Sequence, residues 1–107
     1  LDKQVLTRIS RSLSEGVPKI SDVAGDLCMS ARTLQRRLAD GERSYQSLVD
    51  EARRRLSERL LEETDYSLSE ISFMAGFSDQ SAFTRAFRRW AGQTPRSYRI
   101  QGQSASG

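Results

Sequence analysis

SEISFMAGFSDQSAFTRAFRRW, residues 69–90, is the stretch that decides the fold. Its apolar residues recur every three or four positions on both sides of a single glycine, which is the period of two short amphipathic helices. The spacing predicts one helix near 68–75, a break at Gly76 and a second helix near 79–91. The apolar positions are Ile71, Ala75, Phe83, Phe87 and Trp90. Two helices joined by so short a turn form a helix-turn-helix unit, which we place at 68–91.

An earlier segment repeats this pattern. Residues 21–38 align with residues 69–87 when one extra residue is allowed in the second copy. The matches are Ser21-Asp22-Val23-Ala24 with Ser69-Glu70-Ile71-Ser72, Met29-Ser30 with Phe77-Ser78, and Leu34 and Leu38 with Phe83 and Phe87. The repeat predicts a first helix-turn-helix unit at 21–42.

Small and flexible residues fall where such a unit needs them. The first helix needs a small residue facing its partner, and Ala24 and Ser72 supply it in the two copies. The turn needs a residue that tolerates a positive φ, for which Gly76 is well suited. Cys28 stands at the equivalent place in the first copy, and this departure predicts a slightly different turn there.

The remaining chain also shows only helical periodicity, so we expect an all-α fold of about seven helices. We predict helices near 2–15, from 21 with Ser21 as its cap, and from 30 with Ser30 as its cap to about Gly41. A long helix without glycine or proline should span 44–63, supported by i,i+4 pairs such as Asp50–Arg54. It would form a rod of roughly 30 Å that joins the two units. Thr94-Pro95 should start a last short helix, and 101–107 should be a loose, flexible tail.

Bulk composition limits the class of protein. Of 107 residues, 36% are hydrophobic and 29% are charged, and no apolar run approaches the roughly 20 residues of a membrane-spanning helix. No signal-peptide pattern opens the chain, and the cytoplasm is the natural compartment. Because the first residue is Leu1, we expect a fragment from which an N-terminal region is missing.

Cysteine and histidine usage argues against an enzyme. Cys28 is the single cysteine and histidine is absent, which excludes an internal disulfide and a zinc site built on Cys/His clusters. A Ser-His-Asp or Cys-His catalytic arrangement is excluded too, because the chain has no histidine to act as its base. We therefore expect no catalytic residues, no metal and no cofactor. Cys28 itself we expect to be a small buried residue, as free cysteines usually are.

Positive charge is concentrated in two windows. Residues 31–39 hold three arginines and residues 80–100 hold five, and neither window contains an acid. The net charge of the whole chain is only +3, so the rest of the chain is acidic on balance. Two basic patches on an acidic body indicate two contacts with a polyanion, although solvated helix faces would give the same charges.

The outward faces of the two second helices favour DNA. On the first, Arg32, Gln35 and Arg36 lie within about 100° of arc, opposite the apolar residues. On the second, the outward residues are Gln80, Ser81, Thr84, Arg85 and Arg88. Arginine recognises guanine edges, glutamine recognises adenine, and serine or threonine can do either. A merely solvated face would more usually mix glutamate and lysine with arginine.

The segment 76–90, followed by Gly92-Gln93-Thr94-Pro95 and Tyr98-Arg99, strongly resembles the signature of the AraC/XylS family of transcription regulators. Residues 30–38 are similar to that family's first recognition helix, and the resemblance covers residues from about 5 to 100. It implies seven helices, with two helix-turn-helix units bridged by a central helix. It places Arg32, Gln35, Arg36, Gln80, Ser81, Thr84 and Arg85 at base-facing positions. Ser72, where relatives usually have alanine, is a mild departure that affects local packing.

The same arrangement suggests phosphate contacts and partners. The phosphate candidates are Arg37, Arg88, Arg89, Arg96 and Arg99, of which the last two could equally be structural. Trp90 and Tyr98 we expect in the core, not stacked on bases. We expect a double-stranded DNA operator, RNA polymerase, and a small effector bound only through the missing N-terminal region, with no membrane partner.

Two other classes of function compete with DNA binding: a helical module that binds RNA or protein, and an enzyme. An RNA-binding module would need exposed aromatics on the basic face, and none is evident there. A helical adaptor that docks protein stays open. DNA-repair methyltransferases carry a related domain, but their reactive cysteine needs a zinc cluster and Cys28 stands alone, so this enzyme class is rejected.

Overall fold

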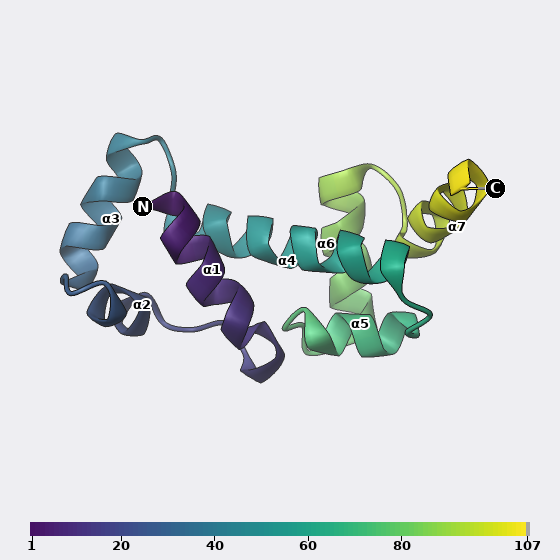
Figure 1. Ribbon diagram of the computed structural model, residues 1–107, viewed down its shortest axis with the longest axis horizontal. Helices are drawn as coiled ribbons and strands as arrows, with labels where there is room; N and C mark the ends of the chain where they lie inside the picture. Colours follow the sequence, from purple (N-terminus) through teal and green to yellow (C-terminus); the bar gives the residue numbers. More distant parts are fainter. Residues whose placement is uncertain (107) are drawn as a thin grey trace. The chain divides into compact units, whose positions relative to one another are not determined.

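The computed structural model describes residues 1–106, with side chains described through Gly102. Over that range the fold is all-α, as predicted, with seven α-helices and one 3-10 turn (Figure 1). The elements are α1 Asp2–Ser12, η1 Leu13–Glu15, α2 Ile20–Asp26, α3 Ala31–Asp40, α4 Tyr45–Glu63, α5 Leu68–Met74, α6 Gln80–Ala91 and α7 Pro95–Ser106. None of the described helices combines the length and apolarity needed to cross a bilayer.

Polar side chains start most of these helices. Ser30 accepts a hydrogen bond from the backbone N–H of Thr33 at 3.1 Å, and Asp79 accepts one from Ala82 at 2.7 Å. Each bond satisfies one of the amide groups that the first helical turn leaves without a partner. The prediction that Ser21 caps α2 is wrong. The carbonyl of Lys19 already accepts bonds from Asp22 and Val23, so the helix begins before Ser21.

The first compact unit comprises Leu1–Arg53. Its core is aliphatic and is formed by α1, α2, α3 and the first part of α4, with Leu34 and Leu38 fully buried as predicted. The other buried residues are Val5, Ile9, Leu13, Val23, Ala24, Leu48, Val49 and Ala52. The hydroxyl of Tyr45 donates a 2.6 Å hydrogen bond to the carbonyl of Pro18, which ties the first turn of α4 to the loop before α2.

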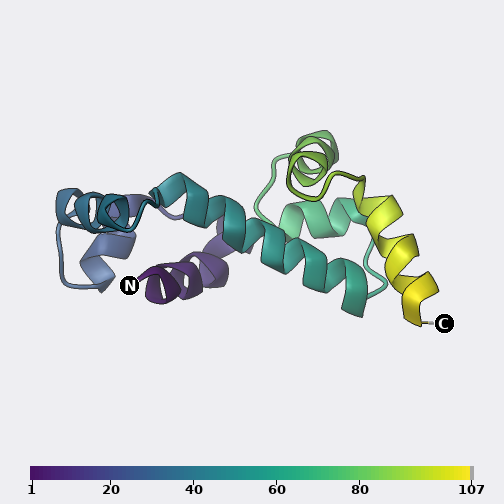
Figure 2. The same cartoon turned by 90° about the horizontal axis from the view of Figure 1, so that it is seen from above.

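The second compact unit comprises Arg54–Gly107, and its described core is aromatic. Phe83 and Phe87 of α6 are fully buried against Ile71 of α5 and the end of α4 (Figure 2, where α6 is seen nearly end-on). Trp90 packs 6.4 Å from Phe87, and Tyr98 of α7 lies 5.3 Å from it, measured between ring centroids. Both rings therefore belong to the core, as expected.

α4 belongs to both units, because the boundary between them falls between Arg53 and Arg54 in the middle of this helix. Its 19 residues correspond to a length of about 28 Å. Arg54 donates a 2.7 Å hydrogen bond to Glu58, and Asp50, its expected partner, accepts one from Gln46.

Two helix ends differ from the prediction. Gly41 follows α3 but has an ordinary negative φ, and Glu42 takes the left-handed position with φ of 60°. At the other end of the chain, α7 continues to Ser106, although a loose tail was expected from residue 101. No proline interrupts the described part of that segment, and Gly102 lies within α7, where a glycine weakens a helix without ending it. Fraying of this last part in solution stays a prediction.

Candidate nucleic-acid interface

The turns of the two helix-turn-helix units have the same hydrogen-bond pattern. In the first, the N–H of Met29 donates to the carbonyl of Ala24 at 3.0 Å, and that of Cys28 donates to Gly25 at 3.0 Å. In the second, Phe77 donates to Ser72 at 2.9 Å and Gly76 to Phe73 at 3.1 Å. This paired pattern closes a helix through one residue in the left-handed region. Each residue of the second turn stands 48 positions after its counterpart in the first.

Cys28 and Gly76 are the left-handed residues, with φ of 60° and 87°. Cys28 therefore adopts the glycine-like conformation, and the turns differ in length instead: residues 27–30 separate α2 from α3, whereas residues 75–79 separate α5 from α6. The expectation that Cys28 is buried is wrong, since the structure places it in solvent.

α3 presents the predicted polar residues of the first unit. Arg32, Gln35 and Arg36 are all exposed, while Leu34 and Leu38 on the opposite side are buried. Arg37 is exposed as well. Among the described residues, none of the three arginines forms an ion pair, so their guanidinium groups are available to an anionic partner.

α6 presents the corresponding residues of the second unit. Gln80, Ser81 and Arg85 are exposed, and Thr84 is part-buried beside them. Because the second copy has one extra residue before this helix, Arg85 stands at the position of Arg36 and Thr84 at that of Gln35. The phosphate candidates Arg88 and Arg89 are also exposed. The two second helices thus carry an exposed arginine at the same place.

Arg99 differs from the other phosphate candidates. Its guanidinium donates hydrogen bonds of 3.2 Å to the carbonyls of Leu61 and Thr64, at the end of α4. The neighbouring Tyr98 hydroxyl donates to Glu62 at 3.0 Å, and burial raises the pKa of Tyr98 to about 12. The last carbonyls of a helix lack partners within it, so Arg99 completes α4. Arg96, by contrast, is exposed.

The sequence allowed a structural Arg99 but could not identify its acceptors. The sequence did indicate that such a donor was needed, because the end of the long predicted helix has no glycine or basic residue that could satisfy its last carbonyls. That signal shows that donors are needed, but not which distant side chain supplies them.

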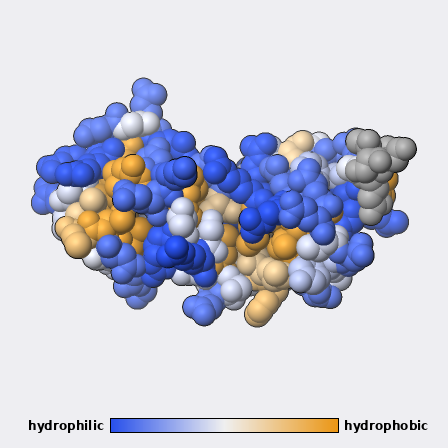
Figure 3. Space-filling view, in the orientation of Figure 1, coloured by the Kyte–Doolittle hydropathy of each residue, from blue (hydrophilic) through white to orange (hydrophobic). Residues whose placement is uncertain are grey.

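The surface around these helices is mostly polar. Hydrophilic residues dominate the face drawn in Figure 3, and apolar colour is confined to smaller areas, including a protruding spot where α5 lies in Figure 1. On α5, the side chain of Phe73 is 68% exposed. Stacking with nucleic-acid bases would need such aromatics on the basic helices, and no aromatic residue of α3 or α6 is fully exposed.

Comparison with protein families matches residues 23–101 to the helix-turn-helix domain. The ornithine utilization regulator of Pseudomonas aeruginosa is 39% identical over 98 residues, which cover 89% of this chain. The HTH-type transcriptional regulator VirS of Mycobacterium tuberculosis is 39% identical over 102 residues, 95% of this chain. The alignments span 29% and 30% of those two proteins, so the chain corresponds to less than a third of their length.

Solved structures of transcription regulators have the same fold. A DNA-binding transcriptional dual regulator from Escherichia coli K-12 superposes with a TM-score of 0.89 at 25% identity, over 96% of this chain and 92% of that one. The DNA-binding domain of AdpA, solved in complex with a target DNA, superposes with a TM-score of 0.78 at 29% identity. That match covers 97% of this chain and 94% of the AdpA domain.

Proposed function

The chain belongs to the AraC/XylS family of helix-turn-helix transcription regulators, and we propose that it binds a specific duplex operator by placing α3 and α6 in adjacent major grooves. The observation that carries the proposal is the repeated exposed face. Two copies of one turn present two helices whose polar sides hold arginine at the same position and whose apolar sides are buried. A major groove admits an α-helix of this kind.

Sequence would be recognised mainly by the base-facing residues. Arg32, Gln35 and Arg36 would contact one groove, and the outward residues of α6 the next. The base-facing residues of α6 would be Gln80, Ser81, Thr84 and Arg85. Arginine can donate two hydrogen bonds to guanine and glutamine can pair with adenine, which supports a role in specificity.

Affinity would come largely from the phosphate backbone. Four exposed arginines are candidates for these contacts: Arg37 on α3, Arg88 and Arg89 on α6, and Arg96 on α7. Arginine contacts to phosphate set the position of a protein on the duplex and carry no sequence information. Successive major-groove turns on one face of DNA are about 34 Å apart, and α3 and α6 would have to match that spacing to occupy neighbouring turns.

The whole protein would act in the bacterial cytoplasm at the nucleoid, where its operator and RNA polymerase are. A small effector would act through a further region of a longer protein, since the regulators it matches are more than three times as long as the matched segment. Membership of a family of DNA-binding regulators favours this role over an enzyme, an RNA-binding module or a protein adaptor.

A selection of bound sequences from a random duplex library tests the proposal. We expect one motif with two separated half-sites, and we expect its binding to be competed by the same duplex but not by single-stranded RNA. Recovery of no enriched duplex, or equal competition by single-stranded RNA, would show that the exposed faces serve a different partner.

A further inference from the structure

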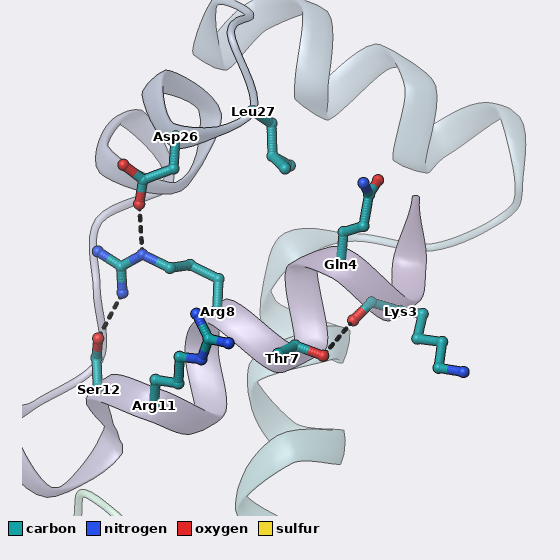
Figure 4. Close-up of a pocket in the computed structure, with 8 residues that line it drawn as sticks. All are labelled: Lys3, Gln4, Thr7, Arg8, Arg11, Ser12, Asp26 and Leu27. Atoms are coloured by element: carbon teal, nitrogen blue, oxygen red, sulfur yellow. Dashed lines mark hydrogen bonds and ion pairs between the residues drawn. The ribbon is translucent and has the colours of Figure 1, made fainter.

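An open groove of about 740 Å³ lies between α1 and the end of α2 in the first unit (Figure 4). Eight residues line it: Lys3, Gln4, Thr7, Arg8, Arg11, Ser12, Asp26 and Leu27. Seven are polar or charged residues, and Leu27 is the one apolar residue among the eight. The groove lies on the outward side of α1, opposite Val5 and Ile9, which are buried in the core.

The charge of this groove is positive. Arg8 is held in place by Asp26 at 2.5 Å and by Ser12, and the hydrogen bond to Asp26 raises its pKa. Lys3 and Arg11 remain exposed, and the structure records no ion pair for either among the residues it describes. Three cations against one carboxylate leave the groove suited to an acidic occupant.

The helix-turn-helix fold does not require these charges. The second unit repeats the same helix pair at an offset of 48 residues, which places Leu56 and Met74 where the first unit has Arg8 and Asp26. Both of those residues pack against the aromatic core of their unit. The first unit therefore has a charged, open groove where the second has apolar packing.

An acidic segment of suitable chemistry exists in the chain itself. Residues 62–66, EETDY, comprise the last two residues of α4 and the start of the corner before α5, and Glu62, Glu63 and Asp65 are exposed there. The carbonyls of Leu61 and Thr64 at this end of α4 already accept hydrogen bonds from Arg99, so the negative charge of this acidic corner comes from its carboxylates. The side chain of Tyr66 is 42% exposed, so the corner also carries an aromatic ring.

We propose that the basic groove of one copy receives the acidic corner of a second copy. Glu63 and Asp65 would face Lys3 and Arg11, and the ring of Tyr66 would rest against Leu27. Glu62 would keep its hydrogen bond from Tyr98. The two surfaces are different, so the contact is heterologous and joins copies head to tail.

This contact would be weak between free molecules, because exposed ion pairs contribute little each. It would become significant where two copies are held close together, since tethering raises their effective concentration. The proposal does not depend on DNA binding and can be tested without DNA.

The single cysteine provides the first experiment, because exposed Cys28 follows Leu27 at the edge of the groove. A thiol-reactive photo-cross-linker on Cys28 is activated in an equal mixture of ¹⁵N-labelled and unlabelled 107-residue chains. We expect cross-links of mixed isotope composition that end within the acidic corner. Cross-links that join residues of one chain only, that end elsewhere, or that are absent at high protein concentration would each overturn the proposal.

Charge exchange provides the second experiment. Arg11→Glu should lower the yield of the inter-chain cross-link about fivefold. Lys19→Glu makes the same change of charge at an exposed residue outside the groove and should leave the yield unchanged. The double variant Arg11→Glu/Glu63→Arg should restore it, because the charges are exchanged between the two surfaces. Equal losses in the two single variants, or no recovery in the double variant, would exclude this pairing.

Discussion

At the scale of single residues, the two turns place a cysteine and a glycine in the same left-handed conformation. For a residue with a Cβ atom this conformation costs about 1–2 kcal/mol, because the side chain crowds the following carbonyl. Glycine avoids that cost but loses more conformational freedom on folding. The first turn therefore holds local strain that the second does not, although both have the same hydrogen bonds.

Cys28→Gly should raise the free energy of unfolding of the first unit by about 0.5–1 kcal/mol, the balance of relieved strain and added entropy loss. Urea unfolding followed by circular dichroism measures the change. Cys28→Ala is the matched control, because it removes the thiol and keeps the Cβ atom, so it should have little effect. A glycine variant no more stable than the alanine variant would show that the turn is not strained.

Arg36 and Arg89 should differ in what they contribute to DNA binding. We expect Arg36→Ala to cost about 1–3 kcal/mol at one base position, because a bidentate contact to a base edge is lost. Arg89→Ala should weaken all duplexes alike and lower the salt slope by about one, as loss of a phosphate contact does. Titration against single-base operator variants at two salt concentrations separates the two outcomes. If Arg36→Ala weakens every operator equally, the specificity assigned to the first unit belongs to the second.

At the scale of secondary-structure elements, α7 is fastened to the end of α4 by Arg99 and Tyr98. Arg99→Ala should lower the free energy of unfolding by about 1–3 kcal/mol, because the carbonyls of Leu61 and Thr64 lose a charged hydrogen-bond donor. It should leave the salt slope of DNA binding unchanged. Thermal unfolding and salt titration test both parts.

Arg96→Ala is the comparison for that prediction. Arg96 is exposed on the same helix, so its loss should leave the unfolding transition in place. If Arg96 contacts phosphate, its loss should reduce the salt slope by about one. The reverse result, in which Arg99 governs the salt slope and Arg96 governs stability, would exchange the roles assigned here.

The helices were predictable from the sequence because each depends on local chemistry. Apolar spacing identified the buried faces of α3 and α6, and Ser30 and Asp79 marked where those helices begin. The contact from Arg99 to Leu61 was not predictable in the same way, because 38 residues separate the partners. Only the folded chain brings such a donor to such an acceptor.

Some local features were also beyond a reading of residue types. Cysteine is usually buried, yet Cys28 is exposed, because it stands in a turn whose backbone conformation is held by hydrogen bonds. In the same way Glu42, not Gly41, takes the left-handed position after α3. The backbone pattern determines these positions, and the residue type only modifies their cost.

At the scale of the whole molecule, the distribution of charge predicts how binding responds to salt. Eight arginines lie in two windows without acid, although the net charge is only +3. We expect the logarithm of the binding constant to fall linearly with the logarithm of salt concentration, with a slope of about 6–10 if that many phosphates are contacted. A slope near zero on the selected operator would mean that the arginine patches do not meet the DNA backbone.

The continuity of α4 across the boundary between the units has a further consequence, which concerns insertions and deletions. Each residue added to an α-helix turns whatever follows by about 100° and advances it by about 1.5 Å. No glycine or proline within α4 offers a place where such a change could be absorbed. A single-residue insertion near Arg53 would therefore change the helical phase of the second unit, whereas seven residues, close to two full turns, would nearly restore it. Among functional relatives, the length of this segment should be far less variable than that of the loops on either side.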